Sequence, residues 1–364
     1  MKKIALSLLL VCLCVSLASA QLLVGGRGAG MGGTGVAASH GIDAAYYNPA
    51  CLMRGDVMAF DLRIAPGAAY TDMAALSDSL ANASDPAKFL LDNYSTNLNF
   101  TGNLSGVVGL NFRKIGLSAV PNLNVTVNKP ALSLGGTVVA GGRYDPTLTL
   151  GTTFSVPYLP AALDVGVNVK SISAIAGSIT ATVDPLDPNK SNGTQTYGTG
   201  TGMGFDLGLL TTLDVPYVSK LAVGAVMRDV SASYVLKSTS KLAHINKTTG
   251  QVTFDAEVPL ADQTITPDSS TALGAYTTIP GIGLGVALDL DMQKAGSFTH
   301  FGLEYPIFFE TVVLRAGLVS GPSTNLTTYG AEINFKLVRL GLASAVDANN
   351  SGLTRTFADV SIGF

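Results

Sequence analysis

The stretch IGLGVALDLDM, residues 282–292, decides the fold class because apolar residues recur in it at every second position. The even-numbered positions are all apolar, whereas the odd-numbered positions carry glycine, alanine and two aspartates, Asp289 and Asp291. Side chains of a β-strand point alternately to opposite faces, so this strand would have one apolar face and one small or acidic face. Helical spacing would scatter the aspartates among the leucines. The stretch is therefore predicted to be a strand.

The same alternation recurs in residues 163–170, 203–209, 312–318, 329–337 and 338–346. In these segments the second face carries mostly small residues with scattered charges. The last alternating segment ends on Phe364, with Ile362 and Val360 on the same face. A terminal phenylalanine that closes such a strand is typical of the signal that the bacterial barrel-assembly machinery reads. We therefore expect Phe364 to be part of an assembly signal.

The composition separates two architectures that both show alternation, a soluble exported β-sandwich or propeller and a transmembrane β-barrel. Only 13% of the residues are charged, against about 25% in ordinary globular domains, and 47% are hydrophobic. A soluble protein would carry more charge on its solvent face, whereas a lumen lined by small residues fits the observed pattern. The sequence therefore predicts an all-β fold, an antiparallel transmembrane β-barrel.

The composition also excludes other classes of protein. The chain is acidic and has no cluster of lysines and arginines that would bind the phosphate groups of a nucleic acid, so no nucleic-acid partner is expected. The longest uncharged stretches after the leader, residues 146–163 and 269–288, contain proline or several glycines and are not membrane-spanning helices. The chain has no HExxH, no GxSxG and no Cys/His cluster, so we expect neither an enzyme, a metal site nor a cofactor.

The domain organisation begins with a signal peptide at residues 1–20, because Lys2 and Lys3 precede an apolar run that ends in Ala18-Ser19-Ala20. Its removal leaves Cys51 as the single cysteine, so no disulfide is possible. Residues 21–52 are predicted to form a glycine-rich N-terminal segment and residues 53–364 the barrel. A helical insertion is expected near residues 71–95, where polar caps precede apolar runs.

Counting strands back from the C-terminus makes long outside loops alternate with short inside turns, as in outer-membrane barrels. The predicted outside loops are residues 347–352, 320–325, 293–296, 237–267 and 181–200. The predicted inside turns lie near residues 337–338, 306–309, 279–280, 214–219 and 156–160. The count reaches fifteen strands, an odd number that this topology forbids. The suspected error lies between residues 104 and 127, where Pro121 interrupts a strand, and residues 67–103 become a long periplasmic connection.

The N-terminal run GGRGAGMGGTG, residues 25–35, contains the letters of a dinucleotide-binding fingerprint, Gly28-x-Gly30-x-x-Gly33. The βαβ unit that this fingerprint needs is absent, so a compact glycine-rich loop is the better interpretation. Residues 21–50 show no strand alternation, yet they are too apolar to be exposed to solvent in the periplasm. Because irregular backbone at membrane depth survives only inside a protein or beside water, we expect this segment to occupy the lumen.

Charged residues on the lumen faces are the candidate functional constellation. They are Asp289, His300, Glu304, Arg315, Glu332 and Lys336. A hairpin centred near residue 294 or 295 would place Asp289 opposite His300, and one centred near residue 323 or 324 would place Arg315 opposite Glu332. Such charges either pair for stability or form a polar constriction or ligand contact.

The segment GRGAGMGGTGVAASHGIDAAYYNPACL, residues 26–52, resembles the start of FadL-like outer-membrane barrels. In that superfamily a GxxxMGMGGA run leads to YNPAGL. Within this superfamily, the segment is most similar to the N-terminal sequence of conjugal-transfer TraF-like barrels. PorV-type barrels of type IX secretion begin with a similar sequence. The resemblance implies about 14 strands and an N-terminal plug that contains Gly28, Gly30, Gly32, Gly33, Asn48, Pro49 and Ala50. Cys51 departs from the family, which usually has glycine there.

The resemblance leaves two functions open. A FadL-like plugged channel would let small hydrophobic molecules enter passively, whereas a TraF-like or PorV-like barrel would be a non-transporting anchor or scaffold for conjugation or secretion components. Either protein would lie in the outer membrane of a diderm bacterium, in contact with lipid and lipopolysaccharide.

Overall fold

The structure is a computed structural model of the chain. It describes residues 23, 25–54, 58–68, 98–129, 135–155, 157, 161–182, 192–216, 219–246, 251–322, 324–335, 337–348 and 354–363. The predicted signal peptide, the predicted helical insertion near residues 71–95, Lys336 and Phe364 lie outside the described residues. Among the described residues, no helix is long and apolar enough to span a membrane.

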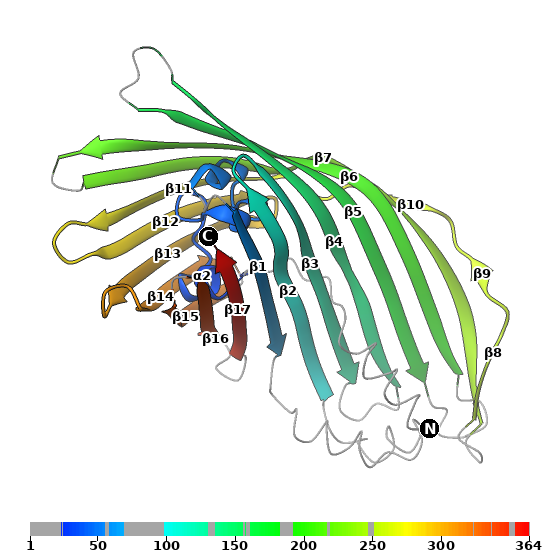
Figure 1. Cartoon of the computed structure of the whole chain (residues 1–364). Coiled ribbons are helices and arrows are strands. Elements are labelled where there is room, and N and C mark those ends of the chain that lie inside the picture. The colour runs from blue at the N-terminus through cyan, green and yellow to red at the C-terminus, as the bar shows by residue number, and fades with distance from the viewer. Residues whose placement is uncertain are drawn as a thin grey trace.

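Antiparallel strands close into a barrel, shown in Figure 1. Among the described residues, seventeen strands form one sheet. The short β8, β9 and β10 pair with β7. The other fourteen form the closed ring, because β1 pairs with both β2 and β17, and β7 pairs with β11. The predicted all-β barrel is confirmed. The strands are β1 (Met58–Ala68), β2 (Leu98–Phe112), β3 (Ile115–Lys129), β4 (Gly135–Phe154), β5 (Leu163–Thr182), β6 (Asn192–Val215), β7 (Ser219–Asn246), β8 (Gln251–Phe254), β9 (Val258–Pro259), β10 (Gln263–Ile265), β11 (Ser270–Ile279), β12 (Leu284–Gln293), β13 (Gly296–Ile307), β14 (Val312–Gly321), β15 (Thr324–Asn334), β16 (Val338–Asp347) and β17 (Thr354–Gly363).

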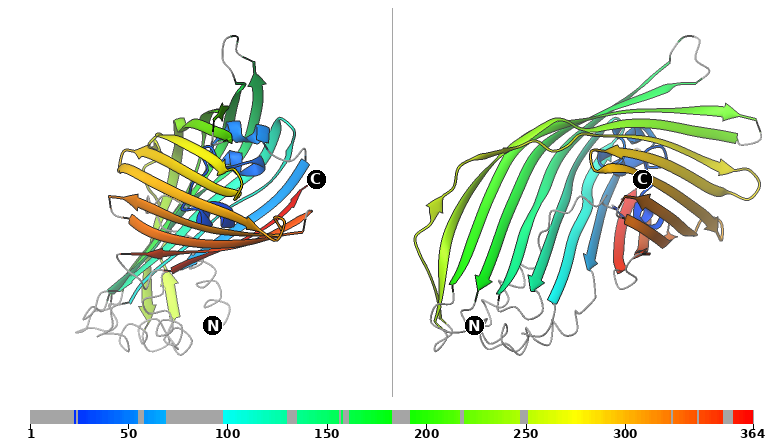
Figure 2. Two further views of the ribbon diagram at one scale, coloured as in Figure 1. Left: turned by 90° about the vertical axis from the view of Figure 1, so that its left-hand side faces the viewer. Right: turned by 180° about the vertical axis from the view of Figure 1, so that it is seen from behind.

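The two sides of the barrel differ in strand length. Strands β11–β17 contain 10 to 12 residues each, close to the 9 to 11 that a tilted strand needs to cross a bilayer. Strands β4–β7 contain 20 to 28 residues. Figure 2 shows these long strands extending well past the short ones towards one end. We call that end the loop end, and the opposite end, with the connections at 215–219, 279–284, 307–312 and 334–338, the turn end.

Two predicted loops are largely strand, which corrects the sequence-based boundaries. β6 begins at Asn192 and β7 continues to Asn246, within the predicted loops 181–200 and 237–267. Residues 192–200 are rich in threonine and glycine, and residues 237–246 are rich in serine and lysine. They lie beyond the level of the short strands, so their outward face needs no apolar residues, and the alternation that marks the other strands is absent.

The predicted count of fifteen strands was wrong, because fourteen of the described strands close the ring. Residues 104–127 belong to two strands, β2 and β3, joined by a tight turn in which Arg113 has a φ of 53°. Pro121 lies within β3, where the ladder to β2 is interrupted between the pairs Ser105–Asn122 and Val108–Ala119. β1 therefore ends and β2 begins at the loop end, where β16 ends and β17 begins, and not at the turn end.

An arginine at Leu288, at the middle of β12, should strongly destabilise the barrel. Leu288 is 52% exposed on the outward face, so the charge would lie in lipid and cost about 2–4 kcal/mol. Leu260→Arg is the matched control, since Leu260 is 43% exposed at the loop end and should cost less than about 0.5 kcal/mol. Urea unfolding in lipid vesicles, followed by the gel shift of the folded barrel, measures both. Equal losses would contradict a lipid-facing belt.

Candidate functional site: the plug and the lumen wall

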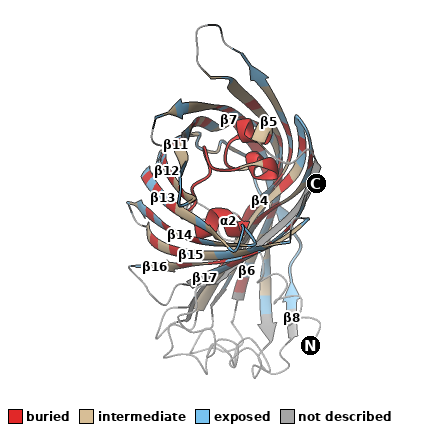
Figure 3. Ribbon diagram, turned by 60° about the vertical axis from the view of Figure 1, so that its left-hand side comes forward, coloured by how far each residue is buried: buried red, intermediate tan, exposed pale blue. Residues whose placement is uncertain are grey.

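The described N-terminal residues between 23 and 54 lie inside the barrel, and we call this segment the plug. It contains α2 (Gly25–Gly30) and two 3-10 helices, η1 (Gly41–Ala45) and η2 (Pro49–Arg54). Figure 3 shows these elements within the ring of strands, almost entirely buried. The plug extends two residues beyond the predicted boundary at residue 52, because η2 ends at Arg54.

The glycines of the plug allow close approach and left-handed backbone. A Cβ added to Gly28 would lie 1.9 Å from the Tyr47 hydroxyl oxygen, and one added to Gly30 would lie 3.1 Å from the Cα of Gly330. Gly32 and Gly33 have φ angles of +66° and +80°, which glycine adopts without strain. The run therefore forms the short helix α2 followed by a tight turn at Gly32 and Gly33, where the sequence predicted a loop throughout.

Glycines of the strands face the plug, and we call them the wall glycines. A Cβ added to Gly166 would lie 2.2 Å from the carbonyl carbon of Pro49, and one added to Gly317 would lie 2.2 Å from the nitrogen of Gly32. The described strand glycines whose added Cβ would lie within 2.6 Å of a backbone or side-chain atom of the plug are Gly166, Gly208, Gly224, Gly274, Gly302 and Gly317. The small residues on the inner face thus make room for the plug.

The Asn48-Pro49-Ala50 motif fastens the plug to β6. Asn48 is fully buried, and its side-chain amide donates hydrogen bonds to the carbonyl oxygens of Val36 at 2.8 Å and Leu209 at 3.1 Å. Its side-chain oxygen accepts a hydrogen bond from the Ala50 amide at 3.1 Å. Pro49 packs against two wall glycines, Gly166 and Gly208. The motif therefore holds the plug's own chain together and binds it to the wall.

Asp289 and His300 form a cross-strand pair, as the hairpin geometry predicted. One carboxylate oxygen of Asp289 accepts hydrogen bonds from the backbone amides of Gly35 at 2.7 Å and Val36 at 2.9 Å. The Nδ1 of His300 lies 2.5 Å from the carbonyl oxygen of Gly32, so this nitrogen is the donor. Hydrogen bonds to a charged acceptor contribute about 1.5–3 kcal/mol each, so Asp289 is a strong anchor of the plug.

Two further wall residues that the sequence reasoning missed bind the same loop. The Thr328 hydroxyl lies 3.0 Å from both the Gly32 nitrogen and the Gly30 oxygen, and Asp359 accepts a hydrogen bond from the Gly26 amide at 3.0 Å. Asp359 lies between Phe357 and Ser361 on the inner face of β17, so its position in the alternation could have indicated its role.

Ion pairs on the short-strand side connect the plug to the wall through Glu304. This carboxylate lies 2.7 Å from the Arg27 guanidinium of the plug and 3.3 Å from that of Arg315. Arg315 also lies 3.1 Å from the carboxylate of Glu332. The predicted register was wrong, because Arg315 is opposite Gly330: the hairpin is centred between residues 322 and 323. Arg315 reaches Glu332 diagonally instead.

A second buried network on the long-strand side was not predicted. Arg143 pairs with Asp145 at 2.6 Å and Asp229 at 3.1 Å. Lys170 lies 2.6 Å from both Asp206 and Asp229. These residues come from four strands, β4 to β7, and only Arg143 and Asp145 share a strand, so the spacing within one strand does not indicate the cluster.

The second network also reaches the plug. The Asn168 amide donates to Asp206 at 2.8 Å and to the carbonyl oxygen of Ala45 in η1 at 3.0 Å. Asp229 and Ser231 both have a φ of 53°, and the β6–β7 register shifts beside them, so an irregularity in β7 places Asp229 against Lys170. Networks on both sides of the lumen therefore hold the plug. Among the described residues, no group of acidic, histidine or cysteine side chains could hold a metal ion.

Comparisons with known proteins support the fold. No model of a protein family matches the chain, and no curated protein is found to match it. The toluene transporter TbuX of Ralstonia pickettii has a similar solved structure, with a TM-score of 0.55, 16% identity and coverage of 94% of this chain and 98% of that one. The toluene transporter TodX of Pseudomonas putida matches with a TM-score of 0.54, 13% identity and coverage of 96% and 97%.

A FadL homologue of Pseudomonas aeruginosa also matches, with a TM-score of 0.54, 12% identity and coverage of 94% of this chain and 98% of that one. At these identities the likeness concerns the fold. The resemblance of the N-terminal segment to TraF-like and PorV-type barrels finds no support in these matches. The chain has the fold of FadL-like outer-membrane β-barrels.

Proposed function

We infer that the chain is an outer-membrane channel through which small hydrophobic molecules enter passively, with the plug controlling the path. The observation that carries this proposal is the plug itself, which is buried in the lumen and bound to the wall from two sides. Barrel diameter grows with strand number, and 16 to 18 strands leave an aqueous channel, so an empty lumen of fourteen strands would be wide and wet. The plug therefore excludes free passage of polar solutes.

Two further features support the proposal. The outward face carries large apolar side chains on β2 to β7 and on β11 to β17, including Leu207, Leu288 and Leu318, as a lipid-embedded barrel requires. Two of the solved structures with this fold are named as toluene transporters, so a neutral aromatic hydrocarbon is a reasonable first substrate to test.

Uptake by whole cells tests the proposal. Diderm cells that express the chain should take up radiolabelled toluene, supplied at low concentration, several-fold faster than cells with an empty vector. Sucrose is the matched control solute, and its entry should not change because the plug fills the lumen. The folded barrel is quantified in each strain by its gel shift without heating. Unchanged toluene uptake at a normal level of folded barrel would contradict the channel and favour the scaffold function.

A further inference from the structure

Strand β7 contains two extra residues at the point where it leaves the closed ring. From Met203 to Leu207 the strand β6 advances by four residues, whereas its partners on β7, residues 227–233, advance by six. The register shifts in two steps, so β7 has two successive β-bulges. On the other edge of β7, residues 229–233 have no ladder partner among the described residues, because the pairs with β11 end before them and those with β10 begin after them.

The bulges direct two successive side chains into the lumen. Neighbours in a regular strand point to opposite faces, yet Arg228 and Asp229 both make contacts inside the barrel. Arg228 donates to the carbonyl oxygen of Tyr47 in the plug at 3.0 Å. The backbone amide of Asp229 donates to Asp206 at 2.9 Å, and Asn168 links that carboxylate to η1. The irregular part of β7 therefore supports the plug.

The backbone of this part of β7 is strained. Asp229 and Ser231 both have a φ of 53°, a left-handed conformation that residues other than glycine seldom adopt. Aspartate tolerates this conformation better than serine does. Ser231 is exposed, so a substitution there acts on the backbone conformation and not on the packing of the lumen. A β7 without the bulges would be free of this strain.

Without its bulges, the part of β7 nearer the loop end would lie two residues, about 7 Å, further along β6. A slide of one residue would turn every side chain to the other face of the sheet, whereas a slide of two keeps each side chain on its own face. Tyr234, which lies opposite Gly202, would then lie opposite Gly200. Leu236 would move in the same way from Gly200 to Gly198.

The facing stretch of β6 is a two-residue repeat that fits both registers. Residues 198–204 read GTGTGMG, with a glycine at every position that faces the lumen. These glycines make room for β7, since a Cβ added to Gly200 would lie 2.8 Å from the ring of Tyr234, and one added to Gly204 would lie 2.9 Å from the Cβ of Ala232. A slide by two residues places each β7 side chain opposite the next glycine. The repeat therefore does not select one register, as is common in glycine-rich strands.

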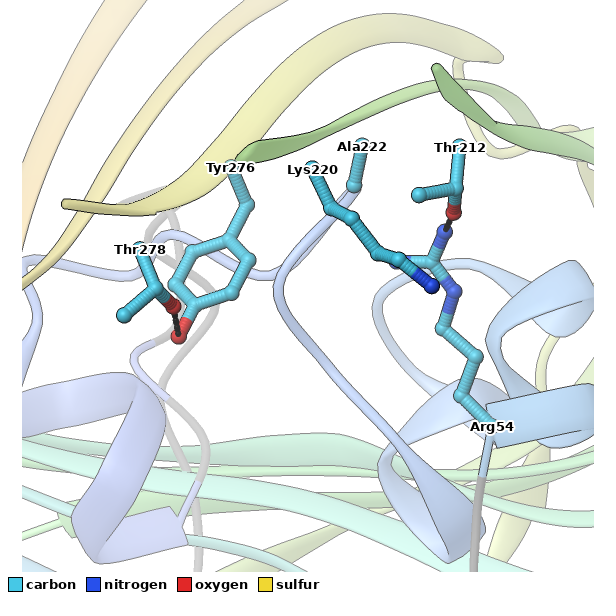
Figure 4. A pocket seen from close by; sticks show the side chains of 6 residues that line it. All are labelled: Arg54, Thr212, Lys220, Ala222, Tyr276 and Thr278. Carbon is cyan, nitrogen blue, oxygen red and sulfur yellow. Dashed lines mark hydrogen bonds between the residues drawn. The ribbon is translucent and has the colours of Figure 1, made fainter. Parts of the chain in front are cut away.

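Near the turn end the same ladder is fixed by its neighbours. Thr212 of β6 pairs with Ala222 of β7, and Ala222 pairs on its other side with Tyr276 of β11. Arg54, at the end of the plug, donates a hydrogen bond to the Thr212 hydroxyl. The cavity of about 480 Å³ at this place, shown in Figure 4, is lined by Arg54, Thr212, Lys220, Ala222, Tyr276 and Thr278. The plug and β11 thus hold this part of β6 and β7, so a slide concerns only the part of β7 beyond the bulges.

We propose that β7 is a register switch, whose part nearer the loop end adopts either the bulged register or one that has slid by two residues along β6. In the slid register Asp229 lies opposite the outward-facing Phe205, so its carboxylate leaves the buried network of the long-strand side. Its amide also leaves Asp206, which weakens the support of η1. The short β10 either moves with β7 or releases its three pairs. The switch does not require transport, so its failure would leave the channel proposal intact, and unchanged toluene uptake would leave the switch intact.

Disulfide trapping in the intact barrel distinguishes the two registers. Thr201→Cys is combined with Val235→Cys, which lies opposite it in the bulged register, or with Ser233→Cys, which lies opposite it in the slid one. These positions are exposed, so an oxidant reaches them, and the cross-link changes the mobility on denaturing gels. Lys237→Cys is the matched control, because it is also two residues from Val235 but lies opposite Thr201 in neither register. The Thr201–Ser233 pair should cross-link several-fold faster than the Thr201–Lys237 pair, and equal rates would overturn the proposal.

Substitutions at Ser231 should shift the balance in opposite directions. Glycine adopts a φ of 53° without strain, so Ser231→Gly should lower the ratio of Thr201–Ser233 to Thr201–Val235 cross-links about fivefold or more. Ser231→Val should raise the ratio, because a β-branched residue disfavours the left-handed conformation and favours a regular strand. The ratio compares two folded forms, so effects on the unfolded chain cancel. A ratio that neither substitution changes, in barrels that fold normally, would overturn the switch.

The cross-linked forms also test the link to the plug. Cys51 is the one cysteine that the predicted mature chain retains, and it is fully buried in the plug. In the form trapped by the Thr201–Ser233 cross-link, Cys51 should react with a charged maleimide several-fold faster than in the form trapped by the Thr201–Val235 cross-link. Equal rates would overturn the effect of the register on the plug.

Discussion

Deleting residues 25–48 should convert the closed barrel into a water-filled pore. The deleted segment contains α2, η1 and the glycine turn, and nearly all of its residues are buried inside the ring of strands. Side chains of a fourteen-stranded barrel cannot fill the lumen without it. The wall charges that lose their plug partners, Asp289 and Glu304 above all, would be hydrated by the entering water. The ring pairing of the strands does not depend on the plug, so the barrel should still insert.

Single-channel conductance in planar bilayers measures the effect of the deletion. The deleted form should conduct steadily, whereas the intact protein should stay at the background level or open only rarely. Sucrose influx into proteoliposomes gives an independent measurement, and the gel shift without heating shows that both forms are folded. A deleted form that inserts normally but is no more permeable than the intact protein would contradict control of permeation by the plug.

Gly317→Ala should displace the plug without removing it. The new methyl carbon would lie 2.2 Å from the Gly32 nitrogen and 2.4 Å from the Met31 carbonyl carbon, and both are backbone atoms that cannot rotate away. Overpacking of this kind costs about 1–3 kcal/mol. That cost falls on the state with the plug in place, so the population with a displaced plug should rise about 5- to 150-fold. Gly177→Ala is the matched control, because its nearest neighbour would lie at 3.4 Å.

The reactivity of the Cys51 thiol measures the displacement of the plug. The thiol is fully buried in η2, and burial raises its pKa to about 12, so it stays protonated and unreactive while the plug is in place. When the plug is displaced, the thiol reaches water and its pKa falls towards the ordinary value of about 8.5. The rate of reaction with a charged maleimide should therefore rise in Gly317→Ala and not in Gly177→Ala. Equal rates in the two variants would show that the wall glycine is not a contact point of the plug.

Local patterns predicted much of the barrel. In β12 the alternation of leucines with Asp289 and Asp291 identifies both faces of the strand, because the direction of a side chain follows from its position alone. The β12–β13 turn is short, so its length sets the register and the Asp289–His300 pair could be derived. The prediction placed the centre of the β14–β15 hairpin one residue too far along the chain. It therefore paired Arg315 with Glu332, whereas the structure pairs Arg315 with Gly330. A register derived from the expected hairpin centre is sensitive to small errors, because a shift of the centre by one residue changes the residue that lies opposite each position.

The contacts of the plug required the closed barrel. Arg27 meets Glu304, 277 residues away, only because β17 returns to pair with β1 and encloses the N-terminal segment. The neighbouring strands β4 to β7 bring Arg143, Lys170, Asp206 and Asp229 together. No spacing in the sequence indicates these pairs, since the partners lie in different elements.

The amino-acid sequence by itself determined the strand periodicity, the side of each strand that meets lipid and the presence of an irregular apolar segment that has to lie inside. These properties depend on neighbours within a few residues, where backbone geometry links sequence position to direction. Only the tertiary structure decided which glycines touch the plug, how the lumen charges pair and that Arg54 and Lys220 share a cavity. Those properties depend on how strands distant in sequence close around the plug, and the free energy of that packing is spread over contacts that no local pattern records.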